Sequence, residues 1–147
     1  MADQDVIDGL IATYRDLNAK VRPLSEERLR LGEPQDTVRG VVTRLRDDEL
    51  RFSQALKDSL TGVPIPNLFG ADAPVLANER ADEATSSILA QFGTARESTL
   101  AMLRALDPTQ WDHQSNGTPS VRARARELLA NDRRCMERII SLLGSPA

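Results

Sequence analysis

The sequence predicts an all-α protein built as a four-helix bundle, and three features of its 147 residues lead to this prediction. Four segments carry apolar residues at spacings of three and four, which is the pattern of amphipathic helices. The alternation of β-branched and polar residues that is typical of strands is absent. Aromatic residues make up only 3% of the chain, so the core is expected to be mainly aliphatic.

The first helix is expected to begin near Asp3 and Asp5, because acidic residues suit the N-terminus of a helix. Its apolar stripe consists of Ile7, Leu10, Ile11, Tyr14, Leu17, Val21 and Leu24. Pro23 should end this helix, and Ser25 is placed to cap a short helical continuation. The break "GEP" at residues 32–34 then separates this region from the second helix.

The second helix is expected to begin near Asp36 or Thr37 and to end at residues 61–62. Its apolar stripe consists of Val38, Val41, Val42, Leu45, Phe52, Leu56 and Leu60. Residues 61–74 are too rich in proline and glycine for regular structure. When extended they could span about 45 Å, whereas a helix of about 20 residues is about 30 Å long. We therefore expect a long crossover between the second and third helices, which would then be parallel.

The third helix should begin between Asn78 and Asp82 and end at residues 107–108, with Gly93 as a weak point in its interior. Its apolar residues are Ile88, Leu89, Phe92, Leu100, Leu103 and Leu106. Trp111, which follows, is expected to cover one end of the core.

The fourth helix should begin at Thr118, with Pro119 in its first turn, and run to about Leu143. Leu128, Cys135, Ile139 and Leu142 share one face of it. Asp132 lies inside this apolar stripe and Asn131 lies beside it. Polar groups on a core face need partners, so this stretch is expected to form a buried hydrogen-bond network.

Length and charge limit the classes of function. We expect residues 1–147 to form a single domain. A net charge of −3 argues against nucleic acid as a partner, and no stretch is apolar enough for a membrane span. One cysteine excludes an internal disulfide framework. Because the N-terminus also lacks the pattern of a signal peptide, a cytoplasmic location is expected.

Three stretches carry a resemblance to a known family: "TVRGVVTRLRDDELRF" (37–52), "LDPTQWD" (106–112) and "SVRARARELLANDRRCMERIISLL" (120–143). Together they resemble the DinB/YfiT-like superfamily of metal-binding four-helix bundles, whose relatives include mycothiol-dependent maleylpyruvate isomerases and other thiol-dependent transferases. The resemblance implies parallel second and third helices. It also implies a divalent metal bound by three histidines at the middle of the bundle.

This chain departs from that pattern at all three histidine positions, which are Arg44, Asn131 and Cys135, while the neighbouring acid is kept as Asp132. A guanidinium has no lone pair for a metal and repels a cation. We therefore expect no metal and no cofactor. The alternative is a changed site for Zn or Ni, formed by Cys135, Asp132 and Asp48.

We hypothesise that Arg44 and Asp132 pair across the bundle and replace the metal as a link between the second and fourth helices. The alternative for Arg44 is a surface pair with Asp48, one helical turn away. Cys135 is interpreted as a small buried apolar residue rather than a nucleophile. His113, the single histidine, is interpreted as a loop residue without chemistry.

Three functions remain open. The preferred one is a non-catalytic binding or scaffold protein with a degenerate metal site. The second is a thiol-dependent transferase with an altered or absent metal, using a small thiol ligand. The third is a protein that binds a small anionic ligand through Arg44. The sequence also leaves open whether the chain forms a homodimer.

Overall fold

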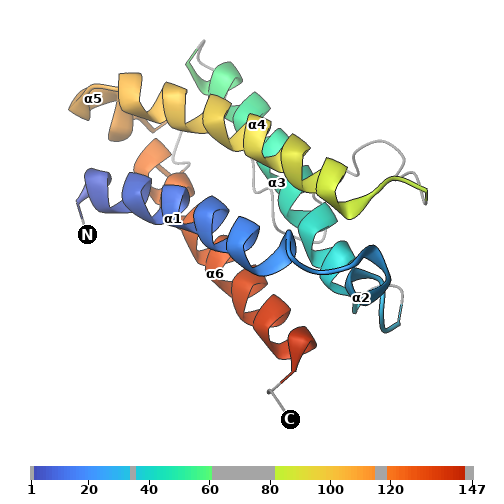
Figure 1. Ribbon diagram of the computed structural model, residues 1–147. Helices are drawn as coiled ribbons and strands as arrows, with labels where there is room; N and C mark the ends of the chain where they lie inside the picture. The colour runs from blue at the N-terminus through green and yellow to red at the C-terminus, as the bar shows by residue number, and fades with distance from the viewer. Residues whose placement is uncertain (1, 34–35, 61–81, 115–118, 145–147) are drawn as a thin grey trace.

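The computed structural model describes residues 2–33, 36–60, 82–114 and 119–144. All regular structure in these residues is helical, which confirms the predicted all-α class (Figure 1). The long helices are α1 (Asp3–Val21), α3 (Val38–Ser59), α4 (Thr85–Ala105) and α6 (Val121–Leu143). The short helices α2 (Glu26–Leu29) and α5 (Pro108–Trp111) follow α1 and α4. None of the helices in these ranges is both long and apolar enough to cross a membrane.

The predicted cap of α2 and the predicted start of α3 are confirmed. The Ser25 hydroxyl accepts a hydrogen bond from the backbone N–H of Arg28, and the Thr37 hydroxyl accepts one from Gly40. Each satisfies an N–H group that the first helical turn leaves without a partner. The second and third helices of the sequence prediction are therefore α3 and α4.

The start predicted for α6 is wrong. Ser120 caps this helix by accepting a hydrogen bond from the N–H of Ala123, so Pro119 precedes the helix instead of lying in its first turn. Gly144 ends the helix as predicted, with a φ of +76° that favours glycine. Thr118 and the predicted connection at 61–74 lie outside the described residues.

The start predicted for α4 is also wrong, because the helix begins at Thr85. The carboxylate of Glu26 accepts hydrogen bonds from the N–H and the hydroxyl of Thr85, so a side chain from α2 caps α4. At the other end, Asp107 caps the short helix α5, which the sequence did not predict. Trp111 in this turn is buried against the core, as predicted.

Helices α3 and α4 run in the same direction. Arg46 bonds Gln91, and further along both helices Ser53 bonds Ser98. Figure 1 shows α1 and α6 running in the opposite direction to this pair. Each long helix packs against two others. Helix α3 contacts α4 and α6, and helix α1 also contacts α4 and α6.

Gly93 of α4 packs against Tyr14 of α1. A Cβ atom at this position would lie 2.3 Å from the hydroxyl oxygen of Tyr14. The Tyr14 ring is held there by an edge-to-face contact with Phe92, with 5.8 Å between ring centroids. The predicted weak point of this helix is therefore a position at which the packing requires glycine.

The buried apolar residues form two clusters at the two ends of the helices. The first cluster contains Val6, Ile7, Leu10, Phe52, Ala55, Leu56, Leu100, Leu103, Trp111, Val121, Ala125, Leu128 and Leu129. The second contains Leu17, Val21, Leu29, Val38, Val41, Val42, Leu45, Ile88, Leu89, Phe92, Cys135 and Ile139. Charged side chains occupy the level between the two clusters.

Candidate functional site

Arg96 lies at the centre of the protein, on the apolar face of α4 between Phe92 and Leu100. Its side chain is 1% exposed, and it is the largest fully buried side chain among the described residues. Its two acidic partners are Glu49 of α3 and Asp132 of α6, with side chains 0% and 1% exposed. We call Arg96, Glu49, Asp132 and the carbonyl group of Leu10 the central network.

The central network joins all four long helices through one guanidinium. Arg96 donates from Nη1 to Asp132 Oδ2 and from Nη2 to Asp132 Oδ1, both at 2.9 Å. Nη2 also donates to Glu49 Oε1 at 2.7 Å, and Nη1 donates to the Leu10 carbonyl oxygen at 2.8 Å. The paired contact with Asp132 is the bidentate geometry in which arginine binds a carboxylate most strongly.

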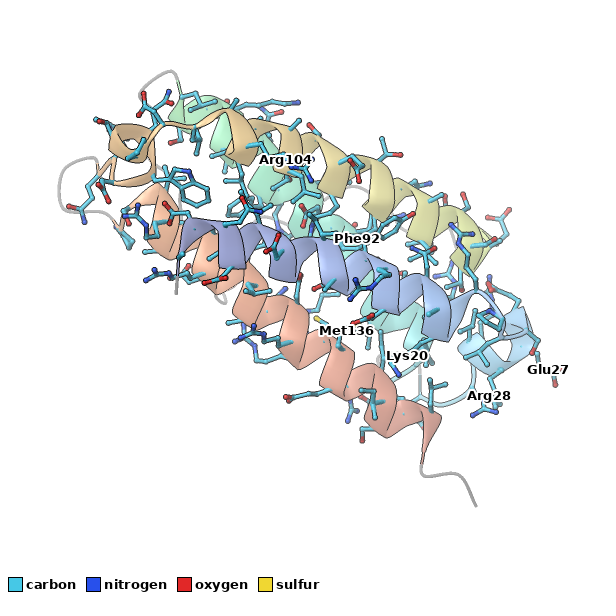
Figure 2. All side chains as sticks on the ribbon, turned by 60° about the vertical axis from the view of Figure 1, so that its left-hand side comes forward. Lys20, Glu27, Arg28, Phe92, Arg104 and Met136 are labelled. Atoms are coloured by element: carbon cyan, nitrogen blue, oxygen red, sulfur yellow. The ribbon has the colours of Figure 1, made fainter. Side chains whose placement is uncertain are left out.

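The surroundings of Arg96 stabilise its positive charge. Its guanidinium carbon lies 4.9 Å from the ring centroid of Phe92, which Figure 2 labels near the middle of the molecule. Burial opposes the charge, but the attraction of Glu49 and Asp132 outweighs burial and raises the pKa of Arg96 above its ordinary value. Two buried atoms, Arg96 Nε and Glu49 Oε2, have no hydrogen-bond partner among the described residues.

The predicted pair between Arg44 and Asp132 is wrong. Both carboxylate oxygens of Asp132 bind Arg96, and Arg44 is exposed on α3. The physical reason is helix rotation, because one residue turns an α-helix by about 100°. Leu45 and Glu49 face the core centre, so Arg44 and Asp48 are turned away from it.

Asp48 and Asn131 meet at a second site, between α3 and α6. Asn131 Nδ2 donates to Asp48 Oδ2 at 3.0 Å, and Arg51 donates to the other oxygen of Asp48. Arg134 Nη2 is 3.5 Å from Asn131 Oδ1. We call these residues, together with Arg44 and Cys135, the α3–α6 face.

Burial controls the ionisation of this face. Asp48 is 4% exposed, and burial raises its pKa even though Asn131 and Arg51 favour the charged form. Burial, with the nearby charges of Asp48 and Asp132, raises the pKa of Cys135 to about 12. The thiol is therefore protonated at neutral pH, which agrees with its interpretation as a buried apolar residue.

Of the positions that the family resemblance assigns to a metal, Asn131 and Cys135 lie one turn apart on α6, Arg44 lies one turn before Asp48 on α3, and Asn131 bonds Asp48. The chemistry of these residues does not fit a metal. Arg44 is cationic, both oxygens of Asp48 already accept hydrogen bonds, and Cys135 does not present a thiolate. In the part of the chain that the structure describes, no three His, Cys, Asp or Glu side chains are grouped in a way that could hold a metal ion.

We expect Cys135 to resist alkylation. With its pKa at about 12 instead of 9.0, the thiolate fraction at about pH 8 falls by about three orders of magnitude. Reaction with iodoacetamide, followed by mass spectrometry, should be slower by at least this factor in the folded protein than in the same protein in denaturant. Equal rates in the two states would contradict the assigned environment.

His113 lies apart from both sites, in the turn after α5. It is exposed, and it lies with Ser59, Leu60 and Gln110 around a cavity of about 280 Å³ at one end of the helices. Its backbone carbonyl accepts a hydrogen bond from the N–H of Val121 and so links this turn to α6.

Comparisons of the chain with models of protein families, with curated proteins and with solved structures find no match, so the assignment of function depends on the chemistry of the central network and the α3–α6 face.

Proposed function

We propose that the chain is a DinB-like four-helix bundle, with a crossover between α3 and α4, that works as a non-catalytic binding or scaffold protein. The observation that carries the proposal is the central network, in which one buried guanidinium holds two carboxylates. In the DinB/YfiT-like superfamily that the sequence resembles, a metal joins helices at the middle of the bundle. Here Arg96 is proposed to serve as that link.

The link is structural because both terminal nitrogens of Arg96 are bonded to groups inside the protein. Arg96 makes four hydrogen bonds to α1, α3 and α6, and its side chain is 1% exposed. A substrate would have to displace these partners and leave two buried carboxylates without a counter-charge, which costs several kcal/mol. Such a group is poorly suited to act as an acid, a base or a ligand-binding cation.

The same reasoning counts against the transferase alternative. A thiol-dependent transferase with an altered metal would need Cys135 or Asp48 as a ligand. The protonated thiol and the occupied carboxylate oxygens do not support this role. A lone thiol of this kind suits a reducing compartment, so the proposed location is the cytoplasm.

Metal analysis tests the proposal. In protein purified without a histidine tag and then incubated with Zn²⁺ or Ni²⁺ and desalted, we expect less than about 0.1 metal ion per chain. A chelator should shift the melting temperature by less than about 1 °C. A stoichiometric metal that disappears in both Asp48→Ala and Cys135→Ala would overturn the proposal.

A further inference from the structure

A groove of about 590 Å³ lies between α3 and α4, and most of the described residues that line it are exposed. Figure 1 shows these two helices side by side. Five of the six described residues that line the groove from α4 are serine, threonine or alanine. Because these side chains are short, they leave a hollow between the two helices. We call it the α3–α4 groove.

The α3–α4 groove carries little charge. Lys57 is the one charged residue among the described residues that line it, in a chain of which 28% is charged. The outward face of a helix in a globular protein is normally polar and charged. The core of a protein–protein interface is instead depleted of charged residues. The composition of the groove is therefore that of an interface and not of a surface that faces water.

A large apolar side chain projects beside this hollow. Leu50 lines the groove from α3 and is 44% exposed. Short side chains of α4, among them Ala90 and Thr94, line the other wall. The same face thus carries both a projecting leucine and a hollow that can receive one. Such a face is complementary to itself, because two copies related by a two-fold axis can each insert Leu50 into the groove of the other.

The charges at the two ends of this stretch of α3 fit the same symmetry. Lys57 has no ion pair with a described residue. Asp47, ten positions or about 15 Å earlier on α3, pairs with Arg46 through Oδ1 only. A two-fold axis that crosses α3 midway between Asp47 and Lys57 brings Lys57 of each copy level with Asp47 of the other. Leu50 of each copy then lies level with Gln54 of its partner, which lines the groove.

We propose that the α3–α4 groove is the interface of a two-fold symmetric homodimer. Leu50 of each copy fills the groove of the other, and Lys57 pairs with Asp47 across the interface. Two adjacent helices of about 20 residues present a face about 30 Å long and about 20 Å wide. Interdigitating side chains extend this flat area of about 600 Å² toward the roughly 800 Å² that each partner buries in a specific interface.

The homodimer goes beyond the proposed function and does not depend on it. The described residues that line the α3–α4 groove belong neither to the central network nor to the α3–α6 face. Substitutions in the groove therefore leave the proposed link between the helices intact, and a bound metal would not bear on the dimer.

Sedimentation velocity of the full chain between about 1 and about 500 µM tests the interface. We expect a concentration-dependent dimer. Leu50→Glu should raise its dissociation constant by at least about a hundredfold, because it places a charge in the centre of the buried surface. Ile140→Glu is the matched control, since Ile140 is 51% exposed on α6, outside the groove, and should leave the constant unchanged.

A charge exchange tests the symmetry. Lys57→Glu and Asp47→Lys should each weaken the dimer by about tenfold, because each places like charges opposite one another twice. An equimolar mixture of the two variants should recover the original affinity, since both contacts of the mixed dimer then join opposite charges. Lys20→Glu, at the other lysine of the chain, is exposed on α1 and is the control.

Three outcomes would overturn the proposed interface. The first is a chain that stays monomeric at the highest concentration, as expected if another molecule or another part of the chain fills the groove. The second is a dimer that Leu50→Glu leaves unchanged. The third is a mixture of the two charge variants that associates no better than either alone. Unchanged melting curves of the variants confirm that the fold is intact.

Discussion

Replacing Arg96 with methionine is expected to lower the free energy of unfolding by about 3–5 kcal/mol. Methionine has a similar length, so the cost arises mainly from charge and not from an empty volume. Glu49 and Asp132 would remain buried without the cation that holds both of them. Urea denaturation followed by far-UV circular dichroism measures this change.

Further variants separate charge from shape at Arg96. Arg96→Lys keeps the charge but cannot reproduce the fork that binds Asp132 at two points, so an intermediate loss is expected. Combining Arg96→Met with Glu49→Met and Asp132→Leu removes the whole set of charges, and this triple variant should recover most of the stability. Arg15→Met, at an exposed position, is the control. A loss below about 1 kcal/mol in Arg96→Met would contradict the structural role of the network.

The second large effect is expected at Gly93. Alanine normally stabilises a helix interior by about 1 kcal/mol relative to glycine. Here its Cβ would overlap the Tyr14 ring, with 2.3 Å to the hydroxyl oxygen and 2.4 Å to Cζ. We therefore expect Gly93→Ala to destabilise the protein by about 1–3 kcal/mol, which is the usual cost of overpacking.

A double-mutant cycle identifies Tyr14 as the cause. In a Tyr14→Ala background, Gly93→Ala should become neutral or stabilising, because only the helix propensity remains. Gly9→Ala is a useful comparison, since the three atoms nearest to a Cβ there would be side-chain carbons of Leu129, the nearest at 2.8 Å. Its cost should be smaller. An equal loss for Gly93→Ala in both backgrounds would show that Tyr14 is not responsible.

Hydrophobic periodicity was sufficient to predict the four long helices but not where all of them begin. The apolar stripes of α1 and α3 predict the positions of these helices correctly, because apolar residues spaced three and four apart indicate an amphipathic helix. The start of α4 depends on Glu26, a side chain from α2 that caps Thr85 from a distance in sequence. Local residue preferences contain no information about such a contact.

The central network had a signal in the sequence that the prediction did not use. Glu49 interrupts the apolar stripe of α3 between Leu45 and Phe52, and Arg96 interrupts that of α4 between Phe92 and Leu100. Charges of opposite sign on two buried stripes, with Asp132 on a third, indicate a shared buried network. We predicted a salt bridge between Arg44 and Asp132 instead, because the sequence does not determine how each helix is rotated about its axis.

The position of the central network between two apolar clusters has a consequence for how the helices align lengthwise. Sliding one helix by a turn, about 5.4 Å, would keep its apolar face directed inward. It would also carry Glu49, Arg96 or Asp132 away from its partners and into one of the two clusters. Aliphatic packing alone tolerates such slips, whereas an unpaired buried charge does not. The network thus selects a single axial register for all four helices.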